Sequence, residues 1–455
     1  MRIRGPILNP QPDGSVQFIA DGALVGDTRG RIAYVGPASH IDTTDFHRSV
    51  GIICPPFFDS HIHIPQHPIR GRFMEGIGPN PPEGRLIAGL HRNVFPAEAR
   101  CADPDYAREV VGGFLQDTLA HGVIGGAAYM TIHPAAARVA LEMLAPTWSV
   151  GLVLMNINCP PQLRTNEATL ERDIQELARD FGRRVIVTDR FAVAVDSRLR
   201  RRAVSIADRL GLRMQTHLNE QLAEKRFVEQ TLYPDAGSYT QVYERDGLLD
   251  RQPILAHCVR MSDGEFERLA THRGVTIAHC PISNTLLGSG VMPLERVMEQ
   301  NLDYAICTDV GASPTTSLLC EMAQFLKVHH AISHRATPGE ALYRTTLAAA
   351  RILELDQEFG SFELGKAMSF VQIDPLTPEL HALSADEVIR SHLLEMHQWS
   401  ATPQYSDAIR KLRETGLDSG PELHLLQRDI QDMVARLDKK VRQVVHYGRT
   451  IWKRN

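Results

Sequence analysis

Residues 57–63 read Phe57-Phe-Asp-Ser-His-Ile-His63, an apolar run that ends in two histidines two positions apart. Alternate residues of a β-strand point to the same side, so His61 and His63 could bind one ion while Ile62 packs away from it. Such a pair is a weak signal by itself, because the chain has 20 histidines. The preceding Asp59, the apolar lead-in and further polar residues after later apolar runs favour a metal site.

The same pattern recurs along the chain, because His217, His257 and Asp309 each end or follow an apolar run. From Pro55 onward, apolar runs alternate with amphipathic stretches typical of helices. Eight runs are candidate strands: 57–63, 123–130, 150–156, 185–192, 212–217, 254–257, 275–279 and 304–308. Eight such units over roughly 250 residues predict an α/β fold, a (β/α)8 TIM-type barrel, rather than a doubly wound sheet. The polar residues would then share the carboxyl-terminal face of the barrel, where function resides.

The two ends of the chain have a different pattern. Residues 1–54 contain short apolar runs separated by closely spaced turn residues, which predicts an antiparallel β element. Two late strands are expected at 369–373 and 441–452, after helices at 317–330 and 338–354. We therefore expect a small discontinuous β-sandwich domain from segments 1–54 and 361–455, and a hydrolase barrel over 55–360. Residues 384–440 are expected to be a largely helical insertion, with a boundary at Pro403.

Composition narrows the class of protein. The 455 residues are 43% hydrophobic and 23% charged, with a net charge of −5, so no electrostatic feature predicts a nucleic-acid partner. The short basic clusters 198–202 and 439–442 are interpreted as solvated helix faces. Seven cysteines lack the spacing of a disulfide framework, which predicts free thiols in a cytoplasmic protein. No apolar run approaches the ~18 residues of a membrane span, so no membrane association is expected.

His217 would supply a third nitrogen ligand and Asp309 an oxygen ligand, leaving one position for water. This arrangement is typical of catalytic rather than structural zinc, although N/O ligands also accept other divalent ions such as Fe²⁺. Zinc-bound water loses a proton near neutral pH. Asp309 could accept that proton and Glu220 could carry it to the substrate. His257 could orient the hydroxide or stabilise a developing oxyanion, and a structural histidine is an equally good interpretation of it.

Other residues near these positions carry weaker signals. His279 is interpreted as structural, and three neighbouring cysteines as buried packing residues: Cys258, Cys280 and Cys307. The sequence contains no Walker A loop, no G-x-S-x-G elbow, no strand-coupled G-x-G-x-x-G and no cytidine-deaminase H-x-E with P-C-x-x-C. These mechanisms are therefore not predicted.

The motifs around the candidate ligands, 59–63, 216–220, 256–258 and 307–311, resemble those of the metal-dependent amidohydrolase superfamily. Within it the chain resembles the guanine deaminase family, on five further stretches: 63–66, 95–98, 131–133, 190–191 and 278–290. The resemblance covers nearly the whole chain and is strongest over 55–374.

This resemblance implies one zinc ion per chain, hydrolysis of guanine to xanthine and ammonia in purine catabolism, and a homodimer. The implied zinc ligands are His61, His63, His217 and Asp309. It also implies a proton shuttle at Glu220 and assistance from His257. Gln66 and Arg190 would hydrogen-bond the purine, with Phe191 beside the ring.

Three stretches depart from the family pattern: 89–94, 192–195 and 311–317. They leave open a relative that deaminates another aminated heterocycle, such as a pterin, an aminotriazine or an oxidised purine. A barrel without activity that serves as a scaffold is the third hypothesis. Scaffolds tend to lose ligands, and here all four candidate ligands and Glu220 are present.

Overall fold

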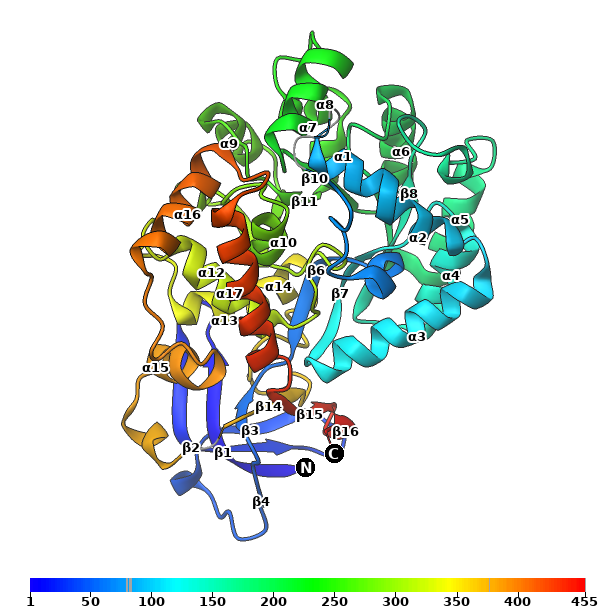
Figure 1. The fold of residues 1–455 in the computed structure, drawn as a ribbon. Helices are drawn as coiled ribbons and strands as arrows, with labels where there is room; N and C mark the ends of the chain where they lie inside the picture. Colours follow the sequence, from blue (N-terminus) through cyan, green and yellow to red (C-terminus); the bar gives the residue numbers. More distant parts are fainter. Residues whose placement is uncertain (79–80, 82–83, 376, 455) are drawn as a thin grey trace.

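A computed structural model describes residues 1–78, 81, 84–375 and 377–454. The larger part is a barrel of parallel strands with helices outside it, and the smaller part is a sheet at one end of the molecule (Figure 1). The barrel strands are β6 (Phe57–His63), β7 (Val123–Tyr129), β8 (Trp148–Leu154), β9 (Val185–Asp189), β10 (Met214–Leu218), β11 (Ile254–His257), β12 (Thr276–His279) and β13 (Asp303–Ile306). Each pairs in parallel with the next, so the predicted barrel fold is confirmed.

Backbone hydrogen bonds beside the predicted ligands join the first strand of the barrel, β6, to the segment that follows the last strand, β13. The Asp309 amide donates to the His61 carbonyl at 2.9 Å, and the His63 amide donates to the Val310 carbonyl at 2.7 Å. Asp59 strengthens this seam, because its buried carboxylate accepts hydrogen bonds from the Thr308 hydroxyl at 2.5 Å and the Thr308 amide at 3.2 Å. Closure of the barrel therefore brings the first and last strands together at the candidate metal site.

Helices fill the connections between strands. Those along the barrel are α3 (Pro104–Ala120), α4 (Pro134–Met143), α5 (Leu170–Phe181), α6 (Ser197–Leu210), α7 (Leu222–Phe227), α8 (Tyr239–Arg245), α9 (Asp263–Ala270), α10 (Pro281–Leu286), α11 (Leu294–Glu299) and α12 (Leu318–His329). The β6–β7 connection is the longest and carries η2 (Ile64–Ile69), α1 (Arg85–Gly89), η3 (Leu90–Val94) and α2 (Phe95–Arg100). Among the described residues, no helix is both long and apolar enough to cross a membrane.

The expected helix over 338–354 is divided into α13 (Pro338–Thr345) and α14 (Leu347–Ile352). Thr346 leaves helical geometry at φ −123° and ψ −93°, and its hydroxyl donates to the Leu342 carbonyl at 2.6 Å. A side chain that bonds the preceding turn competes with the helical hydrogen bond, which accounts for the break.

Strands from both ends of the chain join as expected, and they form one continuous mixed sheet where a β-sandwich was expected. They are β1 (Arg2–Pro10), β2 (Val16–Gly26), β3 (Ile32–Pro37), β4 (His47–Arg48), β5 (Ile52–Cys54), β14 (Phe370–Ile373), β15 (Val441–His446) and β16 (Arg449–Lys453). The expected single strand over 441–452 is instead the hairpin of β15 and β16. Tyr447 and Gly448 both have positive φ at its turn, which suits a two-residue connection. The two termini lie near one another at this sheet (Figure 1).

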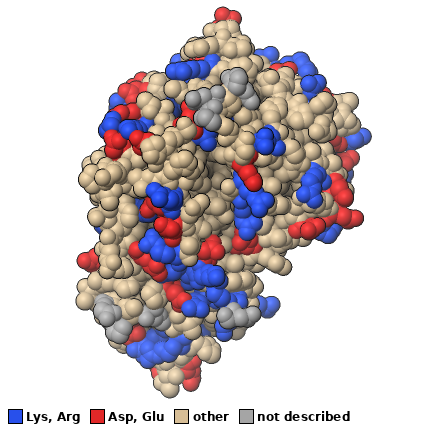
Figure 2. All heavy atoms as spheres, viewed as in Figure 1, with Lys and Arg blue, Asp and Glu red and all other residues tan. Residues whose placement is uncertain are grey.

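Residues 384–440 contain α15 (Ala385–Val388), α16 (Pro403–Thr415) and α17 (Pro421–Leu437), so this stretch is largely helical. α16 begins at Pro403, where a boundary was expected. The seven cysteines are free and buried. Basic and acidic side chains are interspersed on the face drawn in Figure 2.

The interpretation of 198–202 as a solvated face is wrong for Arg200, which is fully buried. Its guanidinium donates to Asp189 at 2.6 Å, to Asp246 at 2.8 Å and to the Val195 carbonyl at 2.7 Å. These bonds satisfy a charge that would otherwise be costly to bury. They also fix the end of β9, from which Arg190 enters the site.

Candidate active site

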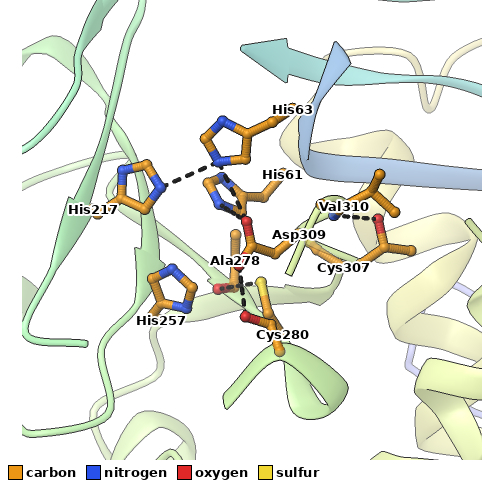
Figure 3. A network of polar contacts seen from close by, with 12 residues as sticks. His61, His63, His217, His257, Ala278, Cys280, Cys307, Asp309 and Val310 are labelled. Carbon is orange, nitrogen blue, oxygen red and sulfur yellow. Dashed lines mark hydrogen bonds and ion pairs between the residues drawn. The ribbon is translucent and has the colours of Figure 1, made fainter. Parts of the chain in front are cut away.

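Four side chains from two barrel strands, β6 and β10, and from the loop after β13 converge at the carboxyl-terminal face. One atom each of His61, His63, His217 and Asp309 lies within 4.8 Å of the others, an arrangement that could hold a metal ion. Asp309 Oδ1 is 3.2 Å from His61 Nε2 and 3.3 Å from His63 Nε2, and His217 Nε2 is 3.3 Å from His63 Nε2. Figure 3 shows the histidine rings around the Asp309 carboxylate.

A bound cation accounts for the arrangement of these donor atoms better than hydrogen bonds among them do. Both ring nitrogens of buried His61 have no hydrogen-bond partner among the described residues, although Nε2 lies close to Asp309. Burial lowers the pKa of His63 to about 3, so its imidazole is neutral as a metal ligand must be. Burial raises the pKa of Asp309, but contacts with the histidine rings outweigh it and hold that pKa well below its ordinary value. Three imidazoles and a carboxylate are a donor set typical of a catalytic divalent ion.

Neighbouring groups orient these ligands. The Arg190 carbonyl accepts a hydrogen bond from His217 Nδ1 at 2.6 Å, which leaves the lone pair of Nε2 directed toward the cluster. Asp309 also adopts φ +54°, and His257 adopts φ +74° at the end of β11. Non-glycine residues rarely adopt such angles, and they concentrate where a site imposes them.

Glu220 and His257 lie together beside the cluster. Oε2 of Glu220 is 3.5 Å from His257 Nε2, and Oε1 accepts a hydrogen bond from the Ser289 hydroxyl at 3.0 Å. Burial raises the pKa of Glu220 well above its ordinary value, the negative charge of Asp309 adds to this effect, and the Ser289 hydroxyl opposes it. Such a carboxyl group can hold a proton at a pH where an exposed glutamate is ionised.

A small cavity connects these groups. Its polar lining comprises Gln66, Arg190, Glu220 and His257 with the ligands His63, His217 and Asp309. Its apolar walls are Phe73, Leu86, Leu90, Phe191 and Leu287. The cavity therefore combines apolar walls with several polar side chains. The structure thus brings every sequence-predicted site residue to one place, while their roles stay predictions.

Several neighbours were not singled out from the sequence. Three polar residues on α10 and the loop after it each bond one site group: Ser283 donates to Asp309 at 2.6 Å, Asn284 donates to His257 Nδ1 at 2.9 Å, and Ser289 donates to Glu220. All three follow the end of β12, so their position after a predicted barrel strand was the available signal.

Glu98 on α2 ends the 95–98 stretch that carries the family resemblance, but no role was assigned to it from the sequence. It is 1% exposed, and its Oε1 accepts hydrogen bonds from Gln66 Nε2 at 3.1 Å and Arg190 Nη1 at 2.5 Å. His279, by contrast, pairs with buried His329 at 3.2 Å and is absent from the cavity lining, in agreement with its structural interpretation.

Comparison with known proteins supports a shared ancestry for this site and fold. Guanine deaminase of Escherichia coli (strain K12) is 30% identical over 407 residues, covering 84% of this chain and 88% of that protein. A probable guanine deaminase of Deinococcus radiodurans is 33% identical over 391 residues, covering 80% and 85%. The solved structure of E. coli guanine deaminase superposes with a TM-score of 0.77 at 25% identity and covers 100% of this chain and 99% of that one. The Amidohydrolase family profile matches residues 52–406. The chain therefore belongs to the amidohydrolase family.

Proposed function

We propose that this protein hydrolyses guanine to xanthine and ammonia with one zinc ion per chain. The observation that carries the proposal is one cavity at which the four-residue candidate metal cluster, the buried carboxyl group of Glu220 and the donor side chains of Gln66 and Arg190 come together. The related proteins described above are named for the same activity.

His61, His63, His217 and Asp309 would hold the metal. A divalent ion there supplies Lewis acidity and makes hydroxide available near neutral pH. The ligands of this chain are suited to zinc, although Fe²⁺ accepts the same donors. The anionic Asp309 carboxylate can also accept a proton from the attacking water, with its Oδ2 steadied by the Ser283 hydroxyl.

Glu220 delivers the proton that the leaving group requires. Deamination adds water across a ring carbon–nitrogen bond, protonates a ring nitrogen, and then protonates the amine so that ammonia leaves. A carboxyl group with a raised pKa can make both transfers, and the Ser289 hydroxyl keeps Glu220 in one orientation.

His257 acts as a neutral donor beside this carrier. Burial lowers its pKa to about 3, and the Asn284 amide donates to Nδ1, so the ring hydrogen resides on Nε2. That hydrogen faces the space between Glu220 and the metal ligands, where negative charge develops during attack on the ring.

Arg190 and Gln66 supply hydrogen bonds to the polar edge of the purine, with Phe191 beside the ring plane. Arginine presents a planar fork that matches carbonyl oxygens and ring nitrogens. The apolar walls exclude water from the faces of the ring.

Steady-state turnover by metal-loaded protein tests the proposal. Guanine, a pterin, an aminotriazine and an oxidised purine should be compared by substrate absorbance and ammonia release, with metal content measured on the same sample. We expect guanine to have the highest kcat/KM and zinc to be present at one ion per chain. Faster turnover of another heterocycle would replace the assigned substrate, and no turnover with full metal occupancy would favour the scaffold hypothesis.

The homodimer and the cytoplasmic location expected from the sequence stay predictions. Sedimentation at several protein concentrations tests the former, and fractionation of cells that produce the protein tests the latter.

A further inference from the structure

Glu98 lies behind the two side chains proposed to bind the purine, and it does not line the cavity. A single oxygen, Oε1, accepts from both Gln66 and Arg190, whereas Oε2 is buried without a hydrogen-bond partner among the described residues. Burying a carboxylate costs free energy, which here only the two hydrogen bonds to Oε1 offset. The arrangement joins the two binding side chains through one charged atom.

The first effect of Glu98 concerns the orientation of the Gln66 amide. An amide group has two orientations of nearly equal shape, which present opposite hydrogen-bonding groups to a ligand. Here Nε2 donates to Glu98 at 3.1 Å, and Oε1 accepts from the Gly311 amide at 3.4 Å. In the reverse orientation, the amide oxygen of Gln66 would face the Glu98 carboxylate, and the amide NH2 of Gln66 would face the backbone N–H of Gly311. Because the Gly311 bond is long, Glu98 contributes most of this preference.

The second effect concerns Arg190, whose side chain is 3% exposed. The ion pair with Glu98 at 2.5 Å balances the buried guanidinium charge through Nη1 alone. Within the described part of the chain, no hydrogen bond is made by Nε or Nη2. The remaining N–H groups of the fork are therefore available to an acceptor in the cavity, which Arg190 lines.

We propose that Glu98 is a positioning residue that sets the donor pattern with which Gln66 and Arg190 meet the substrate, and so determines which edge of a purine is accepted. This inference rests on the proposed function and deepens it. With Gln66 and Arg190 held in these orientations by Glu98, the cavity presents N–H donors to the ring edge, which suits a ring carbonyl. A ring with an amino group in place of the carbonyl would direct N–H groups at the N–H donors of the cavity, and neither set of donors would find an acceptor.

The test compares guanine with 2,6-diaminopurine, which carries an amino group where guanine has its ring carbonyl. Glu98→Gln keeps the size of the side chain and removes its charge. We expect the ratio of kcat/KM for guanine to that for 2,6-diaminopurine to fall about tenfold to a hundredfold, mainly through KM for guanine. Metal content should match that of the unmodified protein, because Glu98 contacts no ligand.

Glu340→Gln is the matched control, because Glu340 also accepts from an arginine, Arg344, at 2.8 Å but lies outside the cavity lining. It should leave the ratio unchanged. Glu98→Asp keeps the charge but shortens the reach to one of the two donors, so it should give an intermediate ratio even if Glu98→Gln folds poorly. Combining Glu98→Gln with Gln66→Ala should add little to either single effect, since both act on one contact.

An unchanged ratio in both Glu98 variants would overturn the inference. Competition binding of the two purines separates this failure from failure of the proposed function. If the unmodified protein does not deaminate guanine, the proposed function fails, and the binding ratio still reports on Glu98. If it deaminates guanine and neither ratio responds to Glu98, the inference on Glu98 alone is wrong.

Discussion

Replacing Glu220 with glutamine removes a transferable proton from the cavity while nearly preserving the shape of the side chain. The carboxamide oxygen can still accept the Ser289 hydroxyl, which is 3.0 Å from Oε1. The other polar neighbour, His257 Nε2, is 3.5 Å from Oε2 and contributes a weaker contact. Because none of the four metal ligands bonds to Glu220, the variant should bind metal normally.

The expected loss is catalytic. Positioned general acid–base groups contribute roughly 100-fold to 10,000-fold to rates, which corresponds to about 3–5 kcal/mol of activation free energy. We expect kcat for guanine to fall by a factor in this range while KM stays near its original value, since Gln66 and Arg190 are untouched.

The stability of the metal-free protein should not fall. The pKa of Glu220 is raised in the folded state, so the folded state retains a proton that the unfolded state releases. The free energy of unfolding therefore decreases as the pH rises above the ordinary value of 4.5. Glutamine has no charge to bury, so at pH 7 the variant should melt at the same temperature or higher.

The assay measures ammonia release and guanine absorbance at saturating substrate, with metal content and thermal unfolding on the same preparations. Glu340→Gln provides the comparison for loss of a carboxylate outside the cavity. A metal-replete Glu220→Gln protein with kcat within an order of magnitude of the unmodified enzyme would refute the role of Glu220 as proton carrier.

Three other perturbations have defined outcomes. Gly311→Ala would place a Cβ 2.9 Å from Gln66 Cβ and 2.9 Å from the Gln66 carbonyl oxygen, so Gln66 would have to shift. We expect KM for guanine to rise about tenfold, and an unchanged KM would contradict this close contact. Asp59→Asn replaces the carboxylate that accepts hydrogen bonds from the His61 amide and from the amide and hydroxyl of Thr308. Because these bonds hold the segments that carry His61 and Asp309, chelator competition should show metal affinity reduced about 10- to 100-fold. The pKa of His257 is lowered from 6.5 to about 3 in the folded state, so as the pH falls the unfolded chain takes up a proton on this histidine before the folded protein does. The free energy of unfolding of the metal-free protein should therefore decrease as the pH falls from 6.5 toward 3. Chemical unfolding of metal-free His257→Asn over this pH range should show a smaller loss, and an equal loss would assign the effect to other groups.

The barrel and the ligand positions could be predicted because they depend on local patterns. Strand periodicity placed His61 and His63 on one side of β6, and the ends of parallel strands meet at one face. The buried position of Arg200 could not be predicted in this way, since it depends on Asp246, which is 46 residues away in the chain. The break at Thr346 likewise depends on which carbonyl its hydroxyl reaches.

Glu98 illustrates what the sequence leaves open at the site. It lies on a short helix within the long β6–β7 connection, so no strand end points to it. Its partners, Gln66 and Arg190, are 32 and 92 residues away, and only the folded chain brings one oxygen between them. Local periodicity carries no information about such a shared contact.

The seam of the barrel has a consequence for the order of events during synthesis. The backbone hydrogen bonds from Asp309 to His61 and from His63 to Val310 join segments about 250 residues apart. A nascent chain that has not yet extended past Asp309 has only part of the ligand set, however well its early strands have formed. An ion bound by all four ligands would link the two ends of this long loop, so metal binding would stabilise the pairing of the first strand with the last.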